Sequence, residues 1–240
     1  LSWRCAHTAV NYDSALAQAR PIGPRSDLPI DLPTHVLHTS GTTGRPKGAL
    51  TTNKTLVWQT LNTASDAGMT GPGCLLLNPM PLFHAGGLTT VAAPMLMTGG
   101  AVATMRRFDA ASVLAVLADA RCGVTHFTAP PVMWLMLADQ PGFEAGDFSH
   151  LRFAQVAGGF PSEDLLARWR ARGVVLQSAY GGTDMGPSVT MMPREFAQTH
   201  PGSCGRAVPF SHVRLVGEDG LDVPAGTSGE LWVKGPAVSP

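Results

Sequence analysis

The stretch Thr39-Ser40-Gly41-Thr42-Thr43-Gly44-Arg45-Pro46-Lys47-Gly48 is the most informative part of this 240-residue sequence. Its glycines permit left-handed backbone angles and a close approach to a ligand, so successive N–H groups can point at one anion. Lys47 adds a compact positive charge. Four hydroxyl side chains add hydrogen-bond donors: Thr39, Ser40, Thr42 and Thr43. The stretch is therefore predicted to be a loop that binds phosphate.

This loop differs from the Walker A phosphate loop, in which a Gly and four further residues precede Gly-Lys-Ser/Thr. Here Lys47 follows Pro46 and precedes Gly48. The order of residues in this stretch instead resembles the signature of the adenylate-forming superfamily, which includes acyl-CoA synthetases, firefly luciferases and the adenylation domains of peptide synthetases. A surface linker rich in Gly, Ser and Thr is the alternative interpretation.

A second motif follows the apolar segment 174–180, which is predicted to be a strand that ends at Gly181-Gly182-Thr183-Asp184. It resembles the Tyr-Gly-x-Thr-Glu motif of the same superfamily. The resemblance implies that Tyr180 stacks near adenine, that Thr183 contacts the α-phosphate region and that Asp184 binds Mg²⁺. An ordinary strand-ending turn is the alternative, since Gly-Gly and Thr-Asp are common in turns.

Asp184 stands where the superfamily usually has Glu, so the carboxylate keeps its charge but loses one methylene. Mg²⁺ requires nearly octahedral oxygen ligands at roughly 2.0 to 2.1 Å, and a shorter side chain can turn direct coordination into coordination through water. Misplacing a catalytic group by about 1 Å can lower a rate on the order of 100-fold. The substitution therefore bears on turnover more than on nucleotide binding.

A third segment, Ala157-Gly158-Gly159-Phe160-Pro161, resembles the Gly-Gly-Ala-Pro segment whose backbone lies against adenine and the acyl pocket. Phe160 replaces the usual small residue, and either narrows the adenine slot or points into the core. A helix is predicted after it, because Ser162 can cap its start and Gly173 can end it. The resemblance assigns the nucleotide to the following residues: Thr39, Ser40, Gly41, Thr42, Thr43, Gly44, Lys47, Gly158, Gly159, Phe160, Tyr180, Gly181, Gly182 and Thr183.

The segment Pro79-Met80-Pro81-Leu82-Phe83-His84 resembles the Pro-Leu-Phe-His segment of acyl-CoA synthetases. There the aromatic or His side chain lines the carboxylate site and gates the pantetheine tunnel, and His84 is the candidate for that place. A structural histidine after an apolar strand is the alternative. The residues assigned to catalysis are Lys47, His84, Thr183 and Asp184.

Strands and helices alternate along the chain, which predicts an α/β fold with a mostly parallel layered sheet flanked by helices, like the N-terminal domain of acetyl-CoA synthetase. Ligand loops then gather at the carboxyl ends of the strands, where the motifs fall. The predicted strands cover 35–38, 74–77, 101–105, 123–127 and 174–180, and the predicted helices cover 53–64, 88–97, 110–120, 131–139 and 163–172.

Two later segments, 201–209 and 229–236, resemble the small β-subdomain of the superfamily, with a strand at 213–216 and a hairpin turn at 218–220 between them. We therefore expect a partial AMP-binding α/β domain at 1–200 and the start of the β-subdomain at 201–240. The Tyr-x-Thr-Gly-Asp segment and the C-terminal domain with the adenylation lysine are absent from the sequence. The chain is interpreted as the middle of a larger synthetase.

Composition fits a soluble enzyme, with 17 basic and 17 acidic residues that give no net charge. This balance gives no electrostatic reason to expect nucleic acid or an anionic membrane as a partner. The four cysteines are widely spaced, which favours reduced thiols and a cytoplasmic location. The apolar segment 91–105 is broken by proline and glycines, so a buried helix and strand are expected instead of a membrane span.

The motifs and the resemblance together predict attack of a carboxylic acid on the α-phosphate of Mg·ATP, followed by transfer of the acyl group to coenzyme A. The segments 81–88 and 106–109 are most similar to those of fatty-acyl-CoA synthetases, and Met185, Met191 and Met192 are candidates for an apolar pocket. Three alternatives stay open: an aryl-acid CoA ligase, a catalytically incomplete nucleotide-binding fragment, and an adenylation domain of a peptide synthetase.

Overall fold

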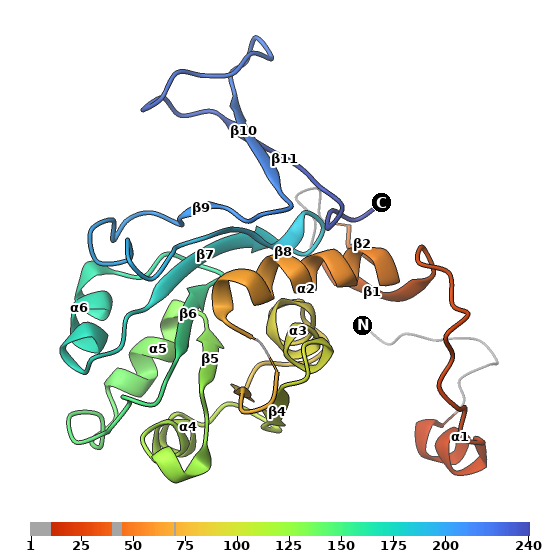
Figure 1. Cartoon of the computed structure of the whole chain (residues 1–240), viewed down its shortest axis with the longest axis horizontal. Helices are drawn as coiled ribbons and strands as arrows, with labels where there is room; N and C mark the ends of the chain where they lie inside the picture. The colour runs from red at the N-terminus through yellow and green to blue at the C-terminus, as the bar shows by residue number, and fades with distance from the viewer. Residues whose placement is uncertain (1–10, 40–44, 70) are drawn as a thin grey trace.

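The computed structural model describes residues 11–39, 45–69 and 71–240 (Figure 1). Its centre is a seven-stranded sheet in the order β4-β3-β5-β6-β7-β8-β9. Neighbouring strands from β4 to β7 run parallel, whereas β8 and β9 are antiparallel to their neighbours. The mostly parallel sheet is thereby confirmed. The strands are β3 (Leu75–Asn78), β4 (Ala101–Thr104), β5 (His126–Ala129), β6 (Phe153–Ala157), β7 (Gln177–Gly182), β8 (Gly186–Met191) and β9 (Arg206–Ala207).

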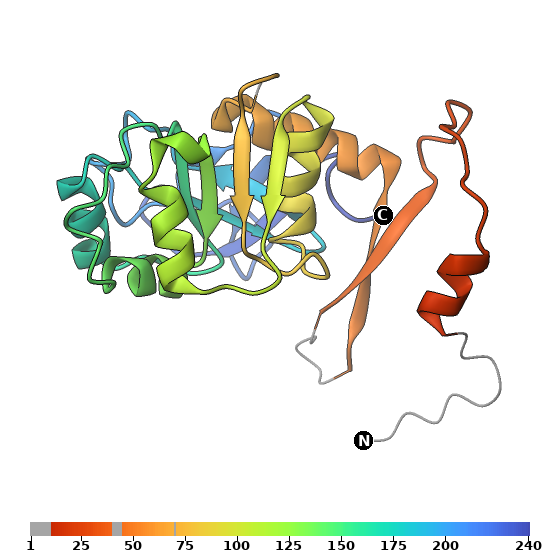
Figure 2. The ribbon, with the colours of Figure 1, turned by 90° about the horizontal axis from the view of Figure 1, so that it is seen from below.

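Helices cover both faces of this sheet (Figures 1 and 2). One face packs against α4 (Ala110–Leu117), α5 (Pro131–Ala138) and α6 (Glu163–Ala171), and the other against α2 (Asn53–Ala67), η1 (Leu88–Ala92) and α3 (Ala93–Met97). Successive strand residues point to opposite faces, so Leu77 and Phe127 join the first core while Leu76 and Phe153 join the second. Burial on both faces explains why β3 and β6 carry mostly apolar residues.

Helix boundaries follow the capping residues. The Leu165 N–H donates to the Ser162 hydroxyl at 3.2 Å, which begins α6 as expected, and Gly173 follows the helix with a φ of 78°. Asp109 caps α4 in the same way. The helix α4 ends at Leu117, earlier than expected, and a short 3-10 turn, η2 (Ala120–Cys122), follows it.

Two antiparallel hairpins lie outside the central sheet. The strands β1 (Pro33–Thr39) and β2 (Lys47–Thr52) flank the predicted phosphate loop, and β10 (His212–Val216) pairs with β11 (Glu230–Lys234) and projects from the body (Figure 1). The expected strand at 35–38 is present, whereas β2 was not expected. The first helix, α1 (Tyr12–Gln18), is exposed throughout. The domain boundary at residue 200 stays a prediction, and β9, which follows it, pairs with β8.

The expected break at Gly181 of the strand predicted at 174–180 is wrong. The strand β7 continues to Gly182, because it pairs with β8 and Gly182 is the partner of Gly186 across the hairpin. A Cβ on Gly181 would lie 2.2 Å from the Pro187 carbonyl oxygen, so only glycine fits this close pairing. The second motif is therefore a tight β-hairpin.

The apolar segment 91–105 forms a helix followed by the strand β4, as expected, and Val91 and Met95 are inaccessible to solvent. The expected burial is wrong for the rest of the segment, since Leu96 and Met97 are exposed and β4 lies at the edge of the sheet. Within the described ranges, none of the helices has the length and apolar character needed to cross a membrane.

A buried histidine next to the second core makes the stability of the fold depend on pH. The His126 ring lies in β5, its Nε2 is 2.9 Å from the Ala67 carbonyl oxygen, and its Nδ1 is 2.7 Å from the Thr125 hydroxyl. Because the Ala67 oxygen can only accept, Nε2 carries the proton and the neutral ring is satisfied. Burial lowers the pKa of His126 below its ordinary value of 6.5, although its bond to Ala67 opposes this effect.

We expect the full-length protein to become less stable as the pH falls from 7 to 5. The unfolded chain then binds a proton on His126 that the folded chain does not, so acidification favours unfolding. Burial lowers the pKa of His35 as well, which acts in the same direction. Between pH 7 and pH 5, the thermal unfolding midpoint of the His126→Gln variant should fall less than that of the unaltered protein. An equal fall in the variant would exclude His126 as the source of the pH dependence.

Candidate functional site

Three cavities lie next to one another at the carboxyl ends of the parallel strands, and we name each after one residue. The His84 cavity has a volume of about 400 Å³, the Tyr180 cavity about 300 Å³ and the Lys47 cavity about 350 Å³. Gly158 and Gly181 line both of the first two. Thr183 lines the His84 cavity and the next residue, Asp184, lines the Lys47 cavity. The sequence motifs therefore meet in one composite site.

The Tyr180 cavity is a slot between the segment that follows β6 and the last residues of β7. Gly158, Gly159 and Phe160 come directly after β6, and Tyr180 lies in β7. Phe160 is 72 % exposed, so it lines the slot and does not enter the core. Gly158 has a φ of 78°, a backbone conformation that favours glycine. Two exposed aromatic rings next to a backbone of glycines suit a flat, apolar ligand.

The His84 cavity lies beside the loop that follows β3. His84 is exposed, and its Nδ1 accepts a hydrogen bond from the Gly86 N–H at 3.0 Å. Asn78 holds the loop, since its Nδ2 donates to the Gly87 carbonyl at 2.9 Å and its Oδ1 accepts from the Met80 N–H. Asn78 was not expected to contribute, because a buried asparagine at a strand end is visible in the sequence only as a turn signal.

The Lys47 cavity lies at the end of the β1–β2 hairpin. Thr39 and Lys47 are paired across it, and both line the cavity with Asp184. The predicted phosphate-binding residues Ser40, Gly41, Thr42, Thr43 and Gly44 lie outside the described residues. The described part brings one cation and one carboxylate to the same hollow, next to the Thr183 hydroxyl. This arrangement suits a phosphate chain with a bound divalent cation.

A family model described as "AMP-binding enzyme" matches residues 5–240. The chain belongs to the AMP-binding enzyme family. Two curated relatives are similar over most of the chain. It is 34 % identical over 230 residues to an indoleacetate–CoA ligase of Aromatoleum aromaticum, covering 95 % of this chain and 44 % of that protein. It is 36 % identical to a feruloyl-CoA synthase of an Amycolatopsis species, covering 88 % of this chain and 43 % of that protein.

Solved structures of similar proteins superpose on this chain over most of its length. The inhibitor-bound N-terminal domain of FACL13 from Mycobacterium tuberculosis superposes with a TM-score of 0.83 at 27 % identity, covering 95 % of this chain and 56 % of that one. ATP-bound MatB from Rhodopseudomonas palustris gives a TM-score of 0.80 at 26 % identity, covering 95 % and 44 %. The chain spans less than half the length of the two curated relatives named above.

Ser239 was also not expected to contribute to the site of this AMP-binding enzyme. Its hydroxyl donates to the Leu50 carbonyl at 2.9 Å and accepts from the Leu50 N–H at 3.0 Å, while its own N–H donates to the Asp184 carbonyl at 2.8 Å. A serine at the far end of the sequence thus joins β2 to the turn that carries Asp184. These contacts span 189 residues for Leu50, so no local pattern could have revealed them.

The donor set around Asp184 fits Mg²⁺ that arrives with a nucleotide. In the described parts of the chain, no three histidine, cysteine or acidic side chains come together as a metal cage. Mg²⁺ bound to substrate phosphates needs only one or two protein carboxylates, since phosphate oxygens and waters complete its octahedron. Asp184 is exposed and lines the cavity that holds Lys47, so it would hold the ion against the phosphates.

The methionine interpretation is wrong for Met191, which is fully buried in the core against α2 and α3. Met192 lines a hollow beside Phe196, outside the three cavities of the composite site. Met185 lines the Lys47 cavity and not the His84 cavity. The apolar wall of the His84 cavity is instead built by Met80, Ala129, Pro130 and Met133.

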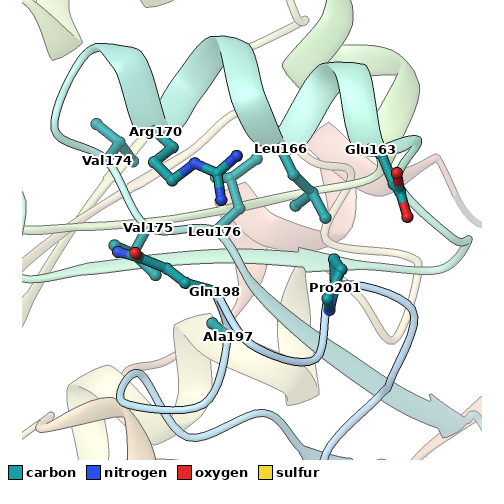
Figure 3. A pocket seen from close by; sticks show the side chains of 9 residues that line it. All are labelled: Glu163, Leu166, Arg170, Val174, Val175, Leu176, Ala197, Gln198 and Pro201. Carbon is teal, nitrogen blue, oxygen red and sulfur yellow. The ribbon is translucent and has the colours of Figure 1, made fainter.

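A fourth cavity lies away from this site, between α6 and the segment around Pro201 (Figure 3). It has a volume of about 110 Å³, and Arg170 and Gln198 are among its polar residues. It contains none of the residues that the sequence motifs single out. We assign it no role in the reaction.

Proposed function

We propose that the full-length protein activates a carboxylic acid with ATP and transfers the acyl group to coenzyme A. The observation that supports this most directly is the composite site, in which Lys47, Tyr180 and His84 line neighbouring cavities at one edge of the sheet. Membership of the AMP-binding enzyme family and relatives named as CoA ligases point to the same chemistry. Because the chain covers less than half of those relatives, the activity is proposed for the whole protein.

The chemistry has two steps. An oxygen of the substrate carboxylate attacks the α-phosphorus of ATP, the bond to the bridging oxygen of the β-phosphate breaks, and pyrophosphate leaves. The thiolate of coenzyme A then attacks the carbonyl carbon of the acyl-adenylate, and AMP leaves with the bonding electron pair. Catalysis of the first step consists mainly of positioning the reactants and stabilising charge.

Each cavity takes one part of the reactants in this proposal. Tyr180 and the backbone of 158–160 frame adenine, Lys47 with the loop before it holds the β- and γ-phosphates, and Thr183 contacts the α-phosphate. His84 faces the substrate carboxylate at the mouth of its cavity. Asp184 would hold Mg²⁺, which would supply charge neutralisation at the phosphates.

The acid is proposed to be an aryl acid, with a fatty acid as the alternative. The relatives are named for indoleacetate and ferulate, and a further one for 2-succinylbenzoate. The similarity of 81–88 and 106–109 to fatty-acyl-CoA synthetases covers short segments only. A cytoplasmic location also stays a proposal, and it rests on the spacing of the cysteines.

Acid-dependent ATP–pyrophosphate exchange by the full-length protein tests the first step. We expect exchange with an aryl acid such as indole-3-acetic acid, and formation of the CoA thioester when coenzyme A is added. Exchange without thioester formation would favour an adenylation domain of a peptide synthetase. The absence of exchange with every aryl and fatty acid tried would favour a catalytically incomplete nucleotide-binding protein.

A further inference from the structure

A row of buried polar side chains crosses the central sheet below the composite site. Thr128 of β5 is the register partner of Gln155 of β6, which is in turn the partner of Gln177 of β7. Asn78 of β3 continues the row, because Leu77 before it pairs with Phe127 before Thr128. All four residues are no more than 3 % exposed. Such a row inside a parallel sheet is unusual, since these strands normally carry apolar residues.

The outer members of the row have hydrogen-bond partners and the inner members do not. Asn78 donates to the Gly87 carbonyl, and Gln177 donates to the Met192 carbonyl at 3.0 Å. Within the described residues, the Thr128 hydroxyl and both polar atoms of the Gln155 amide lack a partner. Buried polar groups are nearly always satisfied, so unpaired ones next to a cavity indicate a ligand that completes them.

Thr128 lies at the buried end of the His84 cavity. Thr128 is only 2 % exposed and lines the cavity together with Thr90, which is also buried. His84 at the mouth of the cavity is exposed. Its neighbours Phe127 and Ala129 belong to the core on the α4–α6 side, so the Thr128 side chain lies on the opposite face. Ala154 and Val156 place Gln155 on that same opposite face, directly beside Thr128.

We propose that Thr128 determines acid specificity by binding a hydroxyl or N–H group on the end of the substrate that is distant from its carboxylate. This inference rests on the proposed function, which places the carboxylate near His84. A hydroxyl both donates and accepts, so Thr128 matches a ring hydroxyl or an indole N–H. Gln155 does not line the cavity, and as the register partner of Thr128 on the same face of the sheet it acts as a positioning residue for that side chain.

The same arrangement discriminates against an acid whose far end is a methyl group or an unsubstituted ring. Such a substrate would fill the cavity against Thr128 and leave its hydroxyl without a hydrogen bond. A site built to hydrogen-bond a substrate group rejects analogues that lack the group far more strongly than an apolar pocket rejects an added one. The polar row thus favours a substituted aryl acid over a fatty acid.

The test compares matched acids in the full-length enzyme. The pairs are 3-(4-hydroxyphenyl)propenoic acid against 3-phenylpropenoic acid, and indole-3-acetic acid against 1-naphthylacetic acid. We expect kcat/KM for exchange to favour the acid with the polar group, in at least one pair, by roughly 10- to 100-fold. In Thr128→Val, which has nearly the same shape, this ratio should fall toward 1.

The matched control is Thr128→Ser, which keeps the hydroxyl and should keep the ratio. Gln155→Met should lower the ratio through a higher KM for the polar acid. No preference in the unaltered enzyme, or an equal loss with both acids of a pair in Thr128→Val, would overturn the inference while exchange itself still supports the proposed function. The absence of exchange with all four acids would instead contradict the proposed activity toward aryl acids.

Discussion

Replacing Asp184 with Asn is expected to lower acid-dependent ATP–pyrophosphate exchange by about 100-fold or more. The side chain is exposed in the Lys47 cavity, and in the described part of the chain no ion pair engages its carboxylate. Its backbone is fixed by the bond from Ser239, so the turn is held while the charge is removed. Loss of a group that stabilises charge in the transition state has an effect of this size in other enzymes.

The matched control is Asp184→Glu, which restores the residue that is usual in the superfamily motif. This variant keeps the charge and adds one methylene, so it should retain exchange within roughly 10-fold of the unaltered enzyme. The Mg²⁺ concentration for half-maximal exchange should rise in the Asn variant and not in the Glu variant. If the exchange rate of Asp184→Asn lay within threefold of that of the unaltered enzyme, Asp184 would have no part in the reaction.

The sequence predicted those elements whose signals are local. Ser162 and Asp109 mark their helix starts because a cap needs only a side-chain oxygen three residues before an N–H. The alternation of helices and apolar strands predicted the parallel sheet, since both follow from burial of each strand on two faces. The loops carrying His84, Gly158 and Thr183 then had to gather, because the carboxyl ends of parallel strands lie at one edge.

Elements that depend on contacts distant in sequence were missed. The strand β2 exists because Lys47–Thr52 pairs with β1 across the loop, and its polar residues carry no strand pattern of their own. The strand β7 extends through two glycines only because β8 returns against it. Ser239 and Thr128 look ordinary in the sequence, since their roles come from Leu50 and from the β5–β6 register. Propensity and spacing hold no information on such pairings.

Truncating Trp169 to Ala is expected to cause the largest loss of stability in this chain, about 3 to 5 kcal/mol. The side chain is inaccessible to solvent, and its ring contacts Trp134, Phe143 and Phe148 at centroid distances of 4.7, 4.9 and 5.2 Å. Its Nε1–H also donates to the Trp134 carbonyl at 3.1 Å. Ala would leave a cavity among these rings and would remove this hydrogen bond.

The effect should reach the composite site, because Trp169 anchors the helix that begins at Ser162, two residues after Phe160. Thermal unfolding of the full-length Trp169→Ala variant should have a midpoint roughly 10 °C lower, with weaker ATP binding below that midpoint. Trp169→Phe keeps most of the packing and should lose less than half as much, while exposed Arg170→Ala on the same helix should change the midpoint little. A midpoint in Trp169→Ala no lower than in Arg170→Ala would show that the aromatic cluster does not hold α6 in place. The position of Phe160 in the adenine slot would then not depend on the packing of this cluster.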